Sequence, residues 1–398
     1  MDKKVFFLLG FIMFLTMTGY GIVLPTLPFI ADDLRLTSFQ MGSLITGWAA
    51  SQLISAPIWG RFADKMGRKP VLIFGLFGFG IAFLILLLAQ NYWQLLLARL
   101  IGAALSSGTH PAVFSIVADY SNKRNRNISI AKMGAVNGLG FLCGPAVGGL
   151  FTPLGVTVPF IVAGTLALVT IPLASIYIKE PKLKEIQLNE DDSTSFWRSV
   201  LMVTKTGYWD LYAITLGLSL AASSFFGLLG YFMIARFSAS AIFVSLAFSA
   251  QAGTSVIVQF FILRKIYELW DEEKISKIGL VVVTVGYGLI ALAPVTWVVI
   301  AGCLFTGFGQ ACVRPTVISL LSKREGMGQG ITMGLQQSMD SLGRIIGPLW
   351  GGWIFSLMIP GPFLTSALIT LLLLAILLVV NSDHRLNMPR IREKNSRM

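Results

Sequence analysis

Long apolar segments separated by short polar segments follow one another along nearly the whole chain. A helix needs about 20 apolar residues to cross a bilayer, and segments of roughly that length recur from end to end. We place twelve predicted spans near residues 5–30, 41–62, 70–90, 93–118, 128–152, 156–178, 208–235, 239–263, 276–294, 296–321, 327–357 and 361–381. The pattern therefore predicts an all-α polytopic membrane protein with twelve transmembrane helices.

One longer polar stretch divides the predicted spans into six and six. It covers residues 179–207 and is rich in Lys, Glu, Asp and Ser. We therefore expect an N-terminal six-helix half at 1–178, a linker at 179–207, a C-terminal six-helix half at 208–381 and a basic tail at 382–398.

Composition and charge support the membrane class and predict an orientation. Charged residues make up 13% of the chain and hydrophobic residues 55%, whereas a soluble domain has about 25% charged residues. The net charge is +12, but nearly all Lys and Arg of the polar segments lie on the side of the two termini, and the opposite loops hold only Arg35 and Arg236. By the positive-inside rule, both termini, the linker and the tail are cytoplasmic. The basic excess therefore indicates topology, and we expect no nucleic-acid partner.

The sequence offers no pattern for metal, cofactor or nucleotide chemistry. Its three Cys residues all fall inside predicted spans, and an odd number in apolar surroundings argues against a disulfide framework. No Cys/His cluster has metal-ligand spacing and no Walker A motif is present. We therefore expect no cofactor, no metal and no enzyme activity.

A ten-residue pattern, GxxxGPxxGG, occurs twice and indicates an internal duplication. The first copy holds Gly140, Gly144, Pro145, Gly148 and Gly149, and the second, 203 positions later, holds Gly343, Gly347, Pro348, Gly351 and Gly352. The segment His110-Pro111-Ala-Val likewise matches Arg314-Pro315-Thr-Val, 204 positions later. Glycines at this spacing let membrane helices approach closely. Two halves of one fold predict a cavity at the middle of the membrane, between the halves.

The predicted loop between spans 2 and 3 reads Gly60-Arg-Phe-Ala-Asp64-Lys-Met-Gly67-Arg68-Lys69-Pro. It resembles motif A of the major facilitator superfamily, with Phe62 in place of the usual Leu. Gly67 permits a tight turn, and Asp64 can face the positive end of a helix.

Three further segments resemble the twelve-helix drug:proton antiporter branch of that superfamily. The segment from Gly140 to Gly149 resembles its motif C, the antiporter signature. Gly19-Tyr-Gly21 through Pro28 resembles its first-helix motif, and Leu95 through Gly102 resembles motif B with Arg99 at the basic position, although Gly102-Ala103 departs from the usual Gln-Gly.

The resemblance implies the major facilitator fold and an alternating-access exporter. It also implies that Arg99 takes part in proton coupling. A conformational latch would be formed by Gly60, Asp64, Gly67, Arg68 and Lys69, together with Asp119 at the end of span 4.

Ionisable residues at membrane depth are costly and indicate functional sites. They are Arg99, His110, Arg314, Asp340 and Arg344, which we predict to line the substrate and proton pathway. Asp340 and Arg344 are four residues apart and can pair on one helix face, which leaves the other three cations without an obvious acid. His110 and Arg314 are expected to face each other across the central cavity. The alternatives are an Arg99 capped by backbone carbonyls and a His110 that is a packing residue.

A cationic cavity suits an anionic or zwitterionic substrate, because Arg binds carboxylates and phosphates with two parallel hydrogen bonds. His110, with an ordinary pKa of about 6.5, and Asp340 are competing proton carriers, and the sequence does not rank them.

We therefore expect a proton-coupled multidrug-type exporter of small organic molecules. One alternative is a dedicated exporter of an anionic or zwitterionic product such as a metallophore or siderophore, and another is an uptake symporter. The expected partners are a small-molecule substrate, protons and the lipid bilayer of a bacterial plasma membrane, with the protein as a monomer.

Overall fold

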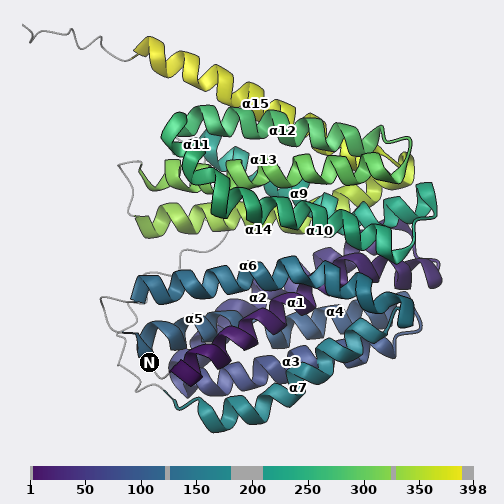
Figure 1. Cartoon of the computed structure of the whole chain (residues 1–398), viewed down its shortest axis with the longest axis vertical. Helices are drawn as coiled ribbons and strands as arrows, with labels where there is room; N and C mark the ends of the chain where they lie inside the picture. The colour runs from purple at the N-terminus through teal and green to yellow at the C-terminus, as the bar shows by residue number, and fades with distance from the viewer. Residues whose placement is uncertain (1–2, 122–125, 181–208, 324–328, 388–398) are drawn as a thin grey trace, which may run out of the picture.

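The computed structural model describes residues 3–121, 126–180, 209–323 and 329–387, which are helical almost throughout (Figure 1). The helices are α1 (Lys3–Asp33), α2 (Ser38–Met66), α3 (Arg68–Leu87), α4 (Tyr92–Ser106), α5 (Thr109–Tyr120), α6 (Arg126–Phe151), η1 (Thr152–Leu154), α7 (Val158–Tyr177), α9 (Trp209–Phe237), α10 (Ala241–Ile257), η3 (Val258–Ile262), α11 (Leu263–Leu269), α12 (Glu272–Ala291), α13 (Thr296–Ser322), α14 (Gln329–Leu357) and α15 (Gly361–Asn387).

Within the described ranges these helices form twelve rods, because α4 continues into α5, and α10 continues through η3 into α11. Ten of the rods are long and apolar enough to cross a membrane. The other two, α2 and α14, have 29 residues each but a more polar composition. They pack against each other between the halves, so part of their surface faces protein rather than lipid.

Two predicted spans differ from simple helices. A turn at Ser107–Gly108 separates α4 from α5. Pro111 contributes to this break, because its ring conflicts with the carbonyl group four residues earlier, that of Ser107. It is not the sole cause, since the equivalent Pro315 lies inside the unbroken helix α13. The rod from α10 to α11 contains one π-helical turn, η3. Such turns are rare insertions that often lie at functional sites, and the sequence analysis did not predict this one.

The rods form two bundles, one from α1 to α7 and the other from α9 to α15 (Figure 1). The bundles meet mainly where α2 packs on α14 and α6 packs on α10. The largest buried apolar cluster continues from one bundle into the other. The 179–207 linker lies outside the described residues apart from Lys179 and Glu180.

The structure repeats with the offset found in the sequence. Helices α3 and α12 have 20 residues each and begin 204 positions apart. Gly75 on α3 lies against Thr109, and Gly279 on α12 lies against Val313, so both members of this close contact recur 204 positions later.

An ion pair recurs with the same offset but with its charges exchanged. Arg68 at the start of α3 pairs with Asp119 near the end of α5. At the equivalent positions Glu272 begins α12, and its Oε1 lies 2.7 Å from Nζ of Lys323, directly after α13. The two halves thus share the geometry of this contact but not its polarity.

The two copies of the Gly-Pro pattern pack each bundle internally. A methyl group on Gly140 of α6 would lie 2.6 Å from the Phe14 carbonyl oxygen on α1, and one on Gly343 of α14 would lie 2.7 Å from the Leu216 carbonyl oxygen on α9. The last glycine of each copy instead faces the other half: Gly149 lies against Ser245, and Gly352 against Ser38.

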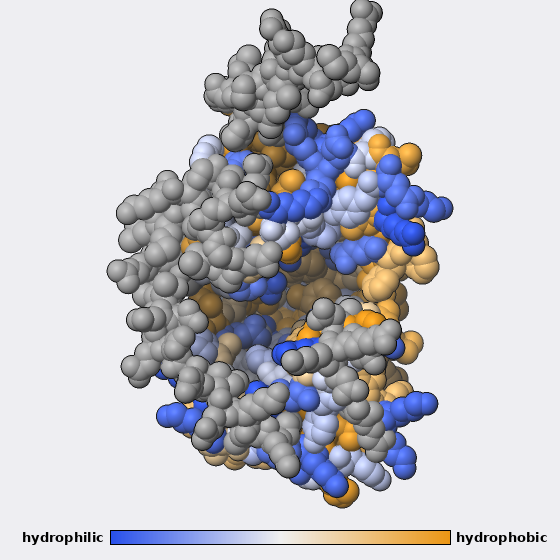
Figure 2. Space-filling view, turned by 90° about the vertical axis from the view of Figure 1, so that its left-hand side faces the viewer, coloured by the Kyte–Doolittle hydropathy of each residue, from blue (hydrophilic) through white to orange (hydrophobic). Residues whose placement is uncertain are grey.

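Among the described residues, the side-chain hydrogen bonds between the bundles lie toward one end of the molecule. We call the end where α1 begins the terminal end, and the opposite one the far end. At the far end, hydrogen bonds join Ser38 Oγ to Gly352 O (2.9 Å), Thr46 Oγ1 to Ile345 O (2.7 Å) and Tyr231 OH to Leu36 O (2.6 Å). At the terminal end the surface is hollowed between the halves (Figure 2).

Candidate functional site

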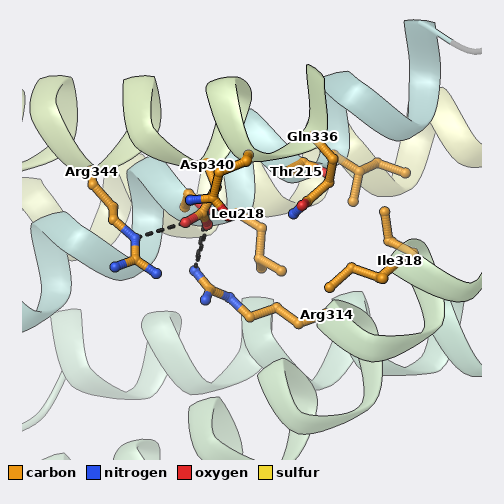
Figure 3. A pocket seen from close by; sticks show the side chains of 11 residues that line it. Thr215, Leu218, Arg314, Ile318, Gln336, Asp340 and Arg344 are labelled. Carbon is orange, nitrogen blue, oxygen red and sulfur yellow. Dashed lines mark hydrogen bonds and ion pairs between the residues drawn. The ribbon is translucent and has the colours of Figure 1, made fainter. Parts of the chain in front are cut away.

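A cluster of charged side chains lies in the C-terminal half (Figure 3). Asp340 on α14 is buried, with 6% of its surface exposed. Its Oδ2 lies 2.8 Å from Nε of Arg344 and its Oδ1 lies 3.2 Å from an Nη of Arg314 on α13. Ser219 on α9 donates a hydrogen bond to Asp340 Oδ1 and accepts one from Arg314 at 3.1 Å. Three helices therefore converge on one carboxylate.

This geometry confirms one expectation and corrects another. Asp340 and Arg344 pair on one helix face, as their spacing predicts. The expectation that Arg314 has no acid was wrong, because α13 and α14 bring it to Asp340. A search for residues four apart on one helix does not detect a contact between residues on two neighbouring helices. With two guanidinium groups and one carboxylate, the cluster keeps one excess positive charge.

The cluster borders a cavity of about 180 Å³. The lining side chains are those of Ile214, Thr215, Leu218, Ser219, Arg314, Val317, Ile318, Gln336, Gln337, Asp340 and Arg344. All come from α9, α13 and α14, so this cavity lies within the C-terminal half, while the surface between the halves is separately hollowed at the terminal end (Figure 2). Arg314 and Arg344 have 39% and 52% of their side-chain surface exposed. Both guanidinium groups therefore keep donors that solvent or a ligand can reach.

Arg99 lies in a separate cluster in the N-terminal half. It is buried, with 6% of its surface exposed, and its guanidinium carbon lies 4.3 Å from the centre of the Trp48 ring on α2. An aromatic face attracts a cation at this distance. Among the described residues Arg99 has no carboxylate partner, and its Nε makes no hydrogen bond. The ring of Trp48, rather than a backbone cap, is therefore the neighbour that the structure gives to this charge.

His110 lies near Arg99 in the fold, on the other side of the break between α4 and α5. Its Nε2 is 3.3 Å from Oγ1 of Thr16 on α1, and its ring centre is 5.6 Å from that of Tyr20. These contacts turn the half-buried imidazole toward α1. In the part of the chain that the structure describes, no direct contact joins His110 to Arg314, and their facing each other across the central cavity stays a prediction.

The motif A segment is not the loop that the sequence predicts: Gly60 through Met66 belong to α2, Arg68 begins α3, and only Gly67 between them forms the turn at the terminal end. Gly67 adopts φ +99°, in the region that favours glycine. Arg68 pairs with Asp119 within the same half. Lys69 donates from Nζ to the Ser175 carbonyl oxygen at 2.6 Å. Gly60 has no neighbour within 4 Å of an added methyl group, and the side chain of Asp64 lies outside the described ones.

Glu180 is a residue of this region that the sequence analysis missed. Its carboxylate accepts hydrogen bonds from the backbone N–H groups of Arg68 (2.6 Å) and Lys69 (2.9 Å). It therefore caps the start of α3, where the helix dipole favours a negative charge. Tyr120 OH donates to the Lys179 carbonyl oxygen at 2.8 Å. The first residues after the sixth rod are thus held against the motif A turn.

Tyr20, Trp48 and Ser219 were also missed. Ser219 and Trp48 have no sequence signal beyond their residue type. Tyr20 does have one, because it lies between Gly19 and Gly21 in a segment already identified as a motif.

Comparisons with known proteins agree with this architecture. The family model described as Major Facilitator Superfamily matches residues 9–324 and 211–396. Quinolone resistance protein NorA of Staphylococcus aureus (strain MSSA476) is 28% identical, over 99% of this chain and all of the relative. Multidrug resistance protein 1 of Bacillus subtilis (strain 168) is 27% identical, over 88% of this chain and 90% of the relative.

Solved structures share the fold. The nucleoside transporter NupG superposes with a TM-score of 0.76 at 14% identity, covering 96% of this chain and 99% of that one. A bacterial homologue of the human lysosomal transporter Spinster, in an inward-facing and occupied conformation, gives 0.73 at 13% identity, covering 95% and 96%.

Proposed function

The chain belongs to the major facilitator superfamily, and we propose that it is a proton-coupled exporter of small organic molecules of the multidrug type. It is a multi-pass membrane transporter rather than an enzyme, with full-length similarity to multidrug efflux proteins. Its site in the bacterial plasma membrane, its two cytoplasmic termini and its action as a monomer are part of the proposal. The uneven distribution of Lys and Arg supports this orientation.

The observation that carries the proposal is the buried carboxylate of Asp340 between Arg314 and Arg344, beside a cavity. A carboxylate that solvent can reach through half-exposed neighbours is a group that can take and release a proton. A proton on Asp340 cancels the charge that holds both guanidinium groups. Proton binding and the availability of the two Arg side chains are therefore linked.

Alternating access supplies the transport step. In this structure the halves are joined at the far end and separated at the terminal end. The motif A turn, the Arg68–Asp119 pair and the capping residue Glu180 lie at the terminal end, where the halves must meet in the opposite conformation. We propose that they form the latch of that closed state.

A second candidate function is favoured by the excess positive charge of the cluster. Two guanidinium groups with free donors, set against one carboxylate, are suited to a ligand that carries carboxylates. Within the described spans, the cavity offers no unpaired acid for a cation. A dedicated exporter of an anionic or zwitterionic product, such as a metallophore or siderophore, is therefore the alternative to multidrug export.

Flux into proteoliposomes under an imposed pH gradient tests both candidates. The probes are ethidium, a cation; norfloxacin, a zwitterion; and EDTA, a carboxylate-rich chelator. The variant is Arg314→Ala, and its control is Arg264→Ala, which removes an Arg that is 90% exposed in its pair with Glu268 on α11.

Gradient-driven flux of ethidium as well as norfloxacin by the wild-type protein supports multidrug export. EDTA flux that collapses in Arg314→Ala but survives in Arg264→Ala supports the dedicated exporter. Higher accumulation in cells that contain the protein than in cells that lack it would instead indicate the uptake symporter and overturn both.

A further inference from the structure

Tyr20 on α1 lies at the meeting point of the N-terminal cluster. Its ring centre is 5.2 Å from that of Trp48, 5.6 Å from that of His110 and 5.7 Å from that of Phe79, in each case edge to face. Its hydroxyl oxygen is 3.4 Å from Oγ of Ser106. Because Trp48 in turn carries the Arg99 guanidinium on its face, Tyr20 links the side chains of Arg99 and His110.

The same contacts bridge the break in the fourth rod. Ser106 is the last residue of α4, and His110 is the second residue of α5. Tyr20 touches both, with its hydroxyl on one side of the break and its ring on the other. A side chain in this position fixes the relative placement of Arg99, on α4, and His110, on α5.

The backbone on either side of Tyr20 is tightly held. Gly19 lies against the Phe79 ring, and a methyl group on Gly21 would lie 2.8 Å from Cα of Gly144, in the first Gly-Pro pattern on α6. Any displacement of α6 along α1 therefore moves the backbone that carries Tyr20. This connects the ring next to His110 with the packing of α1 on α6.

The hydrogen bonds of Thr16 bear on the tautomer of His110. Thr16 Oγ1 lies 2.8 Å from the Ile12 carbonyl oxygen and 3.2 Å from that of Met13, and donates to this turn of α1. With the hydroxyl hydrogen so placed, Oγ1 accepts from Nε2, which assigns the proton of the neutral ring to Nε2 and leaves Nδ1 for an incoming proton. The resulting imidazolium lies within the distance at which an aromatic ring attracts a cation.

Few other ionisable groups surround the imidazole. From α1, Tyr20 is the titratable side chain brought against it, and Arg99 on α4 lies beyond Trp48. Across the break, α2 brings Trp59 against Gly108, and α3 brings Val71. Among the described contacts, α6 adds no ionisable group and no carboxylate touches His110.

We propose that Tyr20 is a positioning residue that holds His110 and Arg99 as one unit across the break between α4 and α5, and that its ring stabilises the protonated imidazole. The role of this unit in proton-coupled transport rests on the proposed function, whereas the effect of Tyr20 on His110 does not.

The protein has two His residues, His110 and His384 in the last turn of α15, which makes His110 directly observable. In protein with ¹³C-labelled His and the change His384→Gln, a single imidazole resonance remains, and its shift with pH gives the titration midpoint of His110. We expect Tyr20→Leu to lower this midpoint by about 0.5–1 pH unit, which corresponds to the loss of one cation–ring attraction. Tyr20→Phe keeps the ring and is expected to keep the midpoint.

The control is Phe79→Leu, which removes a buried aromatic neighbour of Tyr20 that no described contact joins to His110. An unchanged midpoint in Tyr20→Leu, or an equal shift in Phe79→Leu, overturns the proposal. So does an imidazole that does not titrate in the otherwise wild-type protein.

Transport then tests the coupling. We expect Tyr20→Leu to lose gradient-driven norfloxacin flux at least tenfold while keeping norfloxacin exchange in the absence of a gradient, and Tyr20→Phe to restore the driven flux. Equal loss of both fluxes would indicate packing alone and overturn the coupling role. Absence of any norfloxacin flux in the wild-type protein would count against the proposed function. The effect of Tyr20 on the titration of His110 would then still be tested by the imidazole resonance.

Discussion

Replacing Gly138 on α6 by Leu is expected to block transport without harming this conformation. Helix α6 touches α10 where Gly149 meets Ser245, and nearer the terminal end Leu142 lies 3.8 Å from a methyl group added to Gly253. One turn further, a methyl group added to Gly138 would have no neighbour within 4 Å. Closure of the terminal end must bring this face of α6 against the rod that contains η3.

The substitution is expected to stabilise the open conformation slightly and to destabilise the closed one. In the open state Leu meets free space, and its helix propensity exceeds that of Gly by about 0.8 kcal/mol, so thermal stability should stay level or rise. In the closed state the same side chain overfills a helix contact, which costs about 1–3 kcal/mol. At 1.4 kcal/mol per factor of ten, the ratio of closed to open protein should fall roughly 5- to 140-fold, and flux should fall with it.

The assay combines a thermal-shift measurement with gradient-driven norfloxacin flux in proteoliposomes. Gly288 on α12 supplies the control, because it too has open space around it but α12 does not join the halves. Gly288→Leu should keep wild-type flux. The reasoning would be refuted by wild-type flux in Gly138→Leu, or by equal losses in both variants.

Three further predictions concern charged side chains. Asp340→Asn leaves two guanidinium groups without their carboxylate and should lower the free energy of unfolding. The loss should be smaller than the about 3–5 kcal/mol found when a fully buried pair is broken, because both Arg side chains are half-exposed. An unchanged melting temperature together with unchanged flux would contradict this. Glu180→Gln keeps an acceptor oxygen but removes the charge at the start of α3 and should cost about 0.3–1 kcal/mol, seen in thermal unfolding as a larger drop than for Glu268→Gln, which affects an exposed i, i+4 pair near the end of α11. Arg68→Asp should reduce flux, and adding Asp119→Arg should recover part of it; no recovery would mean that the pair does not act through its charges.

The fold was largely predictable because its signals are local. Runs of apolar residues indicate the membrane spans, and two copies of a Gly-Pro pattern indicate the duplication. Both depend on neighbours along the chain. The break before His110 was missed, although Gly108 and Pro111 mark it, because the surrounding segment is apolar enough to be taken as one helix.

The sequence predicts which charged residues belong to the site, but not which residue each of them contacts. Burial cost alone identifies Arg99, Arg314 and Asp340 as special. The partner of each is set by how helices pack, and a pairing such as Arg314 with Asp340, on two neighbouring helices, leaves no trace in the spacing of residues. Glu180 was missed for the same reason, since its partners are backbone groups more than a hundred residues earlier.

The exchanged polarity of the two equivalent ion pairs has a consequence for assembly. Two halves with the same fold present each helix with two similar docking positions as the chain enters the bilayer. If α3 were to pack on α13, Arg68 would face Lys323, and if α12 were to pack on α5, Glu272 would face Asp119. Both mismatches bring like charges together, which disfavours them. The charge pattern therefore favours packing of each helix within its own half over packing against the equivalent position of the other half.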